Sequence, residues 1–222
     1  MIVGFITTQL YLQVVQFSGV RSEALIFIDG IGPLGSYSGS LGYSFTDATT
    51  AELEISLTNT SPAANGGFLT AFVFNNPSNF ISGVSLSTTD SDFGLLGGPS
   101  FSNGINGAPF GQFDIGASTG GGFTGGGNPA LGIAVGGSET FTFSLTGASL
   151  NTLTEQSFLD TLSVPPGDGE GSQSFVARFR GFEDGGSDKV PGTEDGNVIS
   201  EPASLLLFGT GMAAAFLRKR FS

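Results

Sequence analysis

Two segments alternate strictly between apolar and polar residues, and this period of two constrains the fold more than any other feature. Residues 51–58 read Ala-Glu-Leu-Glu-Ile-Ser-Leu-Thr, and residues 139–146 repeat the pattern with Phe141, Phe143 and Leu145 at apolar positions. Successive side chains of a β-strand point to opposite faces, so each segment predicts a strand with one face in a core and one in water. An amphipathic helix has a period of 3.6 residues and does not produce this pattern.

Four further segments have the composition of strands and are separated by turn residues. They are residues 25–29, 84–88, 110–115 and 175–182. A fifth segment, residues 68–74, is apolar at almost every position, which predicts a central strand that is buried on both faces. The 37 glycines and many Ser, Thr and Phe residues favour short strands and frequent turns.

One short helix is predicted after the second alternating segment. Thr152 and Glu155 have the spacing of a capping box, in which a hydroxyl and a carboxylate pair with free N–H groups of the first helical turn. Its buried side would be formed by Leu153, Phe158 and Leu159. We therefore predict an all-β fold, a single antiparallel, jelly-roll-like β-sandwich over residues 25–182 that carries one short helix.

The composition excludes several classes of site and partner. The chain has no His and no Cys, which removes Ser-His-Asp and Cys-His catalysis, His-ligated zinc, thiolate sites and disulfides. Residues 25–200 contain 17 acidic and three basic side chains, a net charge of −14, which excludes nucleic acid as a partner. A pair of carboxylates could still cleave a glycosidic bond, although the absence of Trp disfavours a sugar-stacking cleft.

Residues 1–24 are predicted to be a secretory signal segment. Residues 1–15 are apolar and uncharged, and Ser22-Glu23-Ala24 has the small-x-small pattern that precedes a signal-peptidase cut. No Lys or Arg follows Met1, and Arg21 lies close to the expected cut, so the segment departs from the usual pattern in two ways. The alternative interpretation is a buried N-terminal strand.

Residues 183–199 are interpreted as an acidic, Gly-rich linker that like charges keep extended. The alternative is a calcium site, because calcium binds several oxygen ligands supplied by a flexible loop. Asp184 and Asp188 are the candidate ligands. Their spacing matches neither an EF-hand loop nor a nine-residue calcium repeat.

The C-terminal segment has three consecutive parts. Ser200-Glu201-Pro202 is followed by an uncharged stretch, residues 203–217, and then by the basic cluster Arg218-Lys219-Arg220. A transmembrane helix usually needs about 20 apolar residues, but flanking Arg and Lys side chains can reach the interface from a shorter one. The basic cluster would remain cytoplasmic and leave the preceding residues outside.

This arrangement resembles the PEP-CTERM sorting signal of Gram-negative bacteria, which has a Pro-Glu-Pro signature, a short transmembrane helix and an Arg-rich tail. Ser200 stands here in place of the first Pro, while Glu201-Pro202 and the basic residues fit the pattern. The resemblance implies export, transient anchoring in the inner membrane and processing by an exosortase. The alternatives are a plain tail anchor and a buried helix with a basic end.

The combined interpretation is an exported, non-enzymatic protein of the cell surface or extracellular matrix. The precursor would be anchored in the inner membrane, and the product would reach the outer surface or the medium. The resemblance also implies an association with exopolysaccharide and biofilm. A polysaccharide- or calcium-binding sandwich is the second hypothesis, and a glycoside-active enzyme is the third. No cofactor is expected.

Overall fold

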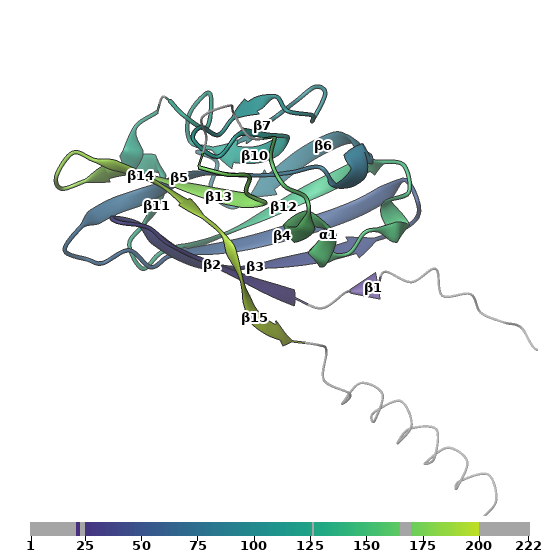
Figure 1. The fold of residues 1–222 in the computed structure, drawn as a ribbon, viewed down its shortest axis with the longest axis horizontal. Helices are drawn as coiled ribbons and strands as arrows, with labels where there is room; N and C mark the ends of the chain where they lie inside the picture. Colours follow the sequence, from purple (N-terminus) through teal and green to yellow (C-terminus); the bar gives the residue numbers. More distant parts are fainter. Residues whose placement is uncertain (1–20, 23–24, 126, 165–169, 200–222) are drawn as a thin grey trace, which may run out of the picture.

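The computed structural model describes residues 21–22, 25–125, 127–164 and 170–199, which form two antiparallel sheets packed face to face (Figure 1). Sheet A has the strand order β15-β2-β3-β4-β12-β6, and β1 also pairs with β3. Its strands are β1 (Arg21–Ser22), β2 (Leu25–Ile31), β3 (Ser36–Phe45), β4 (Thr50–Asn59), β6 (Ile81–Thr88), β12 (Ser138–Gly147) and β15 (Thr193–Ile199).

Sheet B has the order β14-β13-β5-β10-β7, and β11 also pairs with β5. Its strands are β5 (Gly66–Phe74), β7 (Gly94–Leu96), β10 (Ile115–Ser118), β11 (Ile133–Ala134), β13 (Phe175–Phe182) and β14 (Ser187–Pro191). The remaining elements are the hairpin β8 (Ile105–Asn106) and β9 (Gln112–Phe113), the 3-10 turns η1 (Pro77–Asn79), η2 (Pro129–Leu131) and η3 (Leu150–Thr152), and the helix α1 (Glu155–Asp160).

The predicted antiparallel sandwich with one short helix is confirmed. The chain first forms a meander, β2-β3-β4, within sheet A, and then crosses to β5 in sheet B and back to β6. β13 and β14 pair as a hairpin at the edge of sheet B. The jelly-roll likeness stays a prediction.

The core between the sheets is built from the apolar positions of the alternating strands. Ile55 on β4 and Phe143 on β12 are fully buried, as predicted. Phe72 of sheet B packs against Phe141 of sheet A with ring centroids 4.7 Å apart, and Phe74 packs against Phe143 at 5.2 Å. Edge-to-face pairs of this kind stabilise a core beyond the area they bury, so Phe rings hold the two sheets together.

Sheet B is buried on its outer face as well. Val73 and Val176 lie in a second apolar cluster with Phe110, Phe113 and Phe123, which come from the long segment between β7 and β11. This cover explains why β5 is apolar at nearly every position. The prediction of a central strand at residues 68–74 is confirmed, since β5 lies between β13 and β10.

The predicted capping box was placed two residues too early. Thr154, not Thr152, is the N-cap of α1, and its partner is Ser157. Thr152 ends the turn η3, and Glu155 turns inward, where its Oε1 accepts a hydrogen bond from the backbone N–H of Tyr43 at 2.9 Å. The buried position of Phe158 on the helix is confirmed.

Replacing Glu155 tests this long-range bond. Glu155 is 3 % exposed, so Glu155→Ala is expected to leave the N–H of Tyr43 buried and unpaired, which costs about 1–3 kcal/mol of unfolding free energy. Glu155→Gln retains an amide oxygen as acceptor and should lose less. Denaturant unfolding of the two variants measures the difference. Equal losses would show that the negative charge, rather than the acceptor, is what matters.

The predicted linker at residues 183–199 is wrong in its structure. Residues 187–191 form β14, which pairs with β13, and residues 193–199 form β15, which pairs with β2. Val190, which follows Asp188 and Lys189, is fully buried in the core and attaches β14 to the sandwich. The sandwich therefore extends beyond the predicted boundary at residue 182, as far as Ile199.

Candidate functional site

The outer face of sheet A is a broad, polar surface of small side chains. Strands β2, β3, β4, β6 and β12 contain no Lys, Arg or His. Their exposed or half-buried hydroxyl side chains include Ser38, Ser40, Ser44, Ser56, Thr58, Ser85, Ser87, Ser138, Thr140, Thr142, Ser144 and Thr146. Such a face can donate and accept hydrogen bonds across several neighbouring strands.

Cross-strand hydrogen bonds order part of this hydroxyl surface. The Ser56 and Thr140 hydroxyl oxygens lie 2.8 Å apart, and those of Thr58 and Ser138 lie 2.7 Å apart. A hydroxyl has one donor and two acceptor positions, so each member of a pair keeps capacity for a further partner. The pairing holds these groups in fixed positions along β4 and β12.

A shallow hollow of about 210 Å³ lies on this surface. Phe27 of β2 lines this hollow. The rest of its lining comes from Ser38, Gly39 and Ser40 of β3 and from Ser56 and Thr58 of β4. Phe27 alternates with the buried Ile26 and Ile28, which places its half-buried ring on the water side of the sheet. The hollow thus combines an aromatic side chain with several hydroxyl groups, and its lining carries no charged side chain.

A larger open hollow of about 550 Å³ adjoins it at the edge of sheet A. It is lined by Asp29, Gly30, Ile31, Pro191, Thr193 and Glu194. Ile31 is 89 % exposed, more than any other large apolar side chain that the structure describes. Asp29 pairs in register with Ser38, so the two hollows meet along β2 and β3.

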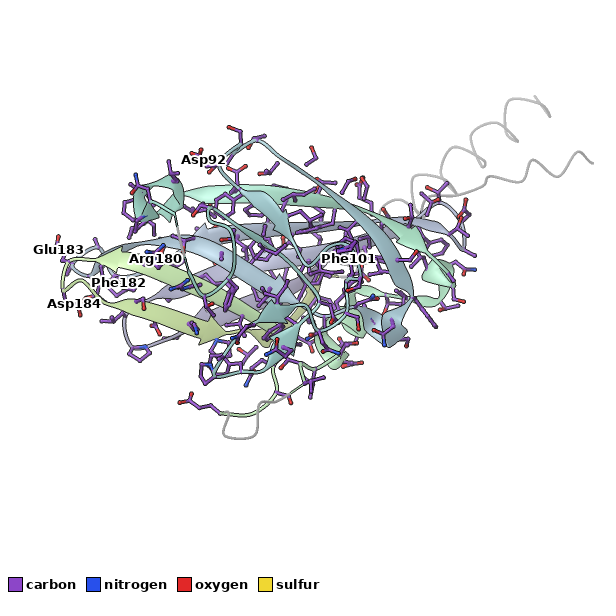
Figure 2. All side chains as sticks on the ribbon, turned by 90° about the horizontal axis from the view of Figure 1, so that it is seen from above. Asp92, Phe101, Arg180, Phe182, Glu183 and Asp184 are labelled. Atoms are coloured by element: carbon purple, nitrogen blue, oxygen red, sulfur yellow. The ribbon has the colours of Figure 1, made fainter. Side chains whose placement is uncertain are left out.

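The two calcium candidates, Asp184 and Asp188, accept hydrogen bonds from different backbone groups. Figure 2 shows Phe182, Glu183 and Asp184 at the end of β13 and the turn that follows. Asp184 Oδ1 accepts a hydrogen bond from Gly186 N at 2.7 Å. Asp188 lies on β14, and its Oδ2 accepts hydrogen bonds from the N–H groups of Leu34 and Gly35 at 2.9 and 3.0 Å.

Asp188 therefore fastens the turn between β2 and β3 to sheet B, a use of the carboxylate that the sequence pattern did not indicate. Within residues 21–22, 25–125, 127–164 and 170–199, no group of three or more acidic side chains is placed to hold a metal ion. Calcium binding by Asp184 or Asp188 stays a prediction.

Three basic residues lie on the outer face of sheet B. Arg178 and Lys189 are register partners, and Arg180 follows Arg178 on the same face. Arg178 donates to the carbonyl of Phe123 at 2.6 Å, and Lys189 donates to the carbonyl of Ala108. Burial, followed by the neighbouring positive charge, lowers the pKa of both side chains. Arg178 and Lys189 thus bind the loop segment that contains Ala108 and Phe123 to the outer face of sheet B.

The carboxylate of Glu139, at the start of β12 on the rim of sheet A, has a clearly shifted pKa. Burial raises its pKa, but hydrogen bonds from Thr89, Thr88 and the N–H of Asp90 outweigh that effect, so the pKa lies below its usual value. The carboxylate thus joins the loop after β6 to the start of β12. It acts as an anchor for this loop.

From the end of β15 onward, residues 198–220 match a known family model, the PEP-CTERM protein-sorting motif. The chain carries a PEP-CTERM sorting motif. The match contains the predicted signature Ser200, Glu201 and Pro202 and the basic residues Arg218, Lys219 and Arg220. A PEP-CTERM motif implies an exported cell-surface protein that an exosortase processes.

The PEP-CTERM motif begins inside the last strand of the sandwich. β15 ends at Ile199, whereas the match starts at residue 198. The signature, the predicted transmembrane helix at residues 203–217 and the basic tail lie outside the described residues, as does most of the predicted signal segment. Arg21 and Ser22, within that segment, pair with β3.

No curated protein and no solved structure shows significant similarity to the chain. Among the residues that the structure describes, no helix is long and apolar enough to cross a membrane. Sequence reasoning missed the hollow beside Phe27, because the run Leu25-Ile26-Phe27-Ile28 is apolar throughout. One local signal was Asp29, which is polar and lies two residues after Phe27. Residues two apart in a strand share a face, so Asp29 indicates that Phe27 faces water.

Proposed function

We propose that this chain is a non-enzymatic protein of the outer cell surface or extracellular matrix, where its sandwich associates with exopolysaccharide in a biofilm. The observation that carries the proposal is the PEP-CTERM motif at residues 198–220, which follows the sandwich without a separate linker. The folded domain is therefore the part that sorting would deliver. Its acidic, hydroxyl-rich surface suits a hydrated extracellular environment.

The carboxylates with clear partners support a structural role. Glu155 accepts from a backbone N–H in the core, and Asp188 accepts from two in the turn that it secures. Asp114 is buried and accepts from the backbone N–H of Asn76 at 2.8 Å. Asp29 and Glu194 both line the larger hollow, which is where a glycoside-active enzyme could bring two carboxylates to a sugar. Turnover of a polysaccharide by the purified chain would favour that alternative.

Intact-mass analysis of the protein from its native host, fractionated into inner membrane, outer membrane and medium, tests the proposal. We expect a product that has lost its C-terminus near Glu201 and is located at the outer surface or in the medium. A full-length C-terminus confined to the inner membrane would contradict the proposal and leave a tail-anchored domain.

A further inference from the structure

We infer that the hollow beside Phe27 binds one sugar ring of an uncharged polysaccharide chain. The inference rests on the proposed function, which brings the sandwich among extracellular polysaccharides, and it identifies the surface and the class of sugar. Phe27, Ser38, Ser40, Ser56 and Thr58 are the side chains that would contact the ring.

The strand register places these side chains in two short rows. Phe27 lies opposite Ser40, and Ser40 lies opposite Ser56, so the first row crosses three strands. Ser38 and Thr58 are opposite each other in the next row. Neighbouring strands are about 4.8 Å apart and rows on one face about 7 Å apart, so the group covers an area comparable to a sugar ring.

The chemistry of the lining matches the two kinds of surface on a hexose. A pyranose ring has an apolar face of C–H groups, which packs on an aromatic ring, and an equatorial rim of hydroxyls. Phe27 supplies the aromatic contact. Ser56 and Thr58 supply hydroxyls that are held by their partners on β12, 2.8 and 2.7 Å away, and so lose little freedom on binding.

Among the described side chains of this face, the large apolar ones lie on β2, where Leu25 and Ile31 are exposed and Phe27 is the aromatic one. The outward residues of β3, β4 and β12 are small hydroxyl residues, glycine or Glu, whereas Phe27 presents a large apolar ring on the water side. An apolar side chain that is left partly in water forgoes some of the stability that full burial would contribute. A ligand that covers the ring recovers this contribution.

The charges around the hollow select against acidic polymers. Its own lining is uncharged, while Asp29, Glu52 and Glu54 lie on the surrounding outer face. Strands β2, β3 and β4 contain no basic residue that could pair with a uronate or a sulfate. A polyanion would therefore meet repulsion, whereas an uncharged chain needs only hydrogen bonds and ring stacking.

The size of the hollow indicates a single ring of a longer chain. Sites that enclose a whole small ligand have volumes of about 300–1,000 Å³. The hollow of about 210 Å³ is smaller and open, so neighbouring sugars would extend over the sheet. One path leads along β2 to the larger hollow, where Asp29 pairs with Ser38.

Calorimetric titration of the full chain in detergent tests the inference with three uncharged hexasaccharides, namely β-1,4-, β-1,3- and α-1,4-linked glucose. Oligogalacturonate of equal length serves as the acidic probe. We expect at least one glucan to bind and the galacturonate to bind at least tenfold more weakly. Phe27→Ala should weaken glucan binding about tenfold, which corresponds to about 1.4 kcal/mol.

Phe68→Ala is the matched control, because Phe68 is also half-buried but lies on β5 of sheet B. It should leave binding unchanged. Ser40→Leu fills the hollow while keeping Phe27, and should also weaken binding, with thermal unfolding confirming that it folds. Absence of glucan binding, or unchanged binding in both Phe27→Ala and Ser40→Leu, overturns the inference.

Fractionation of the native host separates this failure from that of the proposed function. A parent protein found at the outer surface that binds none of the glucans overturns the sugar site alone. A parent protein retained uncut in the inner membrane overturns the proposed function, whatever the calorimetry gives.

Discussion

Phe72→Ala is expected to lower the free energy of unfolding by about 3–5 kcal/mol, the usual cost of removing a large aromatic ring from a core. Phe72 is fully buried, and its ring lies 4.7 Å from Phe141, 6.0 Å from Phe143 and 5.6 Å from Phe175, measured between centroids. It therefore contacts both sheets. Domains are usually stable by only about 5–15 kcal/mol, so one substitution would remove much of the total.

Urea unfolding followed by far-ultraviolet circular dichroism measures this loss. Phe68→Ala provides the comparison on the same strand, because Phe68 is half-buried and lies outside the core between the sheets. It should cost about 1–2 kcal/mol. Similar losses for the two variants would contradict a core that is centred on Phe72.

Several strands were accessible to sequence reasoning because their signal is local, whereas β3, rich in Ser and Gly, was not predicted. In β4 and β12 every second residue faces the core, and β13 begins and ends where residues 175–182 predicted. The same reasoning failed at residues 183–199, where the charged composition concealed β14 and β15. Val190 in the core and the bonds from Asp188 to Leu34 and Gly35 depend on residues far away in the chain.

Tertiary contacts also decided the helix start and the candidate site. Thr152 with Glu155, and Thr154 with Ser157, both have the spacing of a capping box. The second pair forms, while the Glu155 carboxylate accepts a hydrogen bond from the backbone N–H of Tyr43 instead. The hollow beside Phe27 requires the register of β2, β3 and β4, which no local pattern specifies. The sorting motif, by contrast, is defined by consecutive residues and was predictable from the sequence.

Glu201→Ala combined with Pro202→Ala is expected to abolish C-terminal processing and leave nearly all of the protein at full length in the inner membrane. The matched residues 198–220 contain both positions, and they form the polar signature before the apolar stretch. Ser200→Pro should have the opposite effect, because it restores the Pro-Glu-Pro signature, and should raise the processed fraction. Mass spectrometry of the C-terminal peptide in each membrane fraction measures both effects.

Glu183→Ala is the control, since Glu183 is an exposed acid outside the matched residues, and it should be processed like the parent. Processing of the double variant at the parent level would contradict a role for the signature.

The structure also limits where the cut can fall. Ile199 pairs with Leu25, so a cut near Glu201 leaves β15 in sheet A, and the mature protein should unfold at the same temperature as the precursor. A cut before Thr193 would remove β15 and expose the edge of β2, whose unpaired backbone groups favour aggregation. Cleavage after Ile199, the last paired residue, would therefore keep β15 as the edge strand of sheet A.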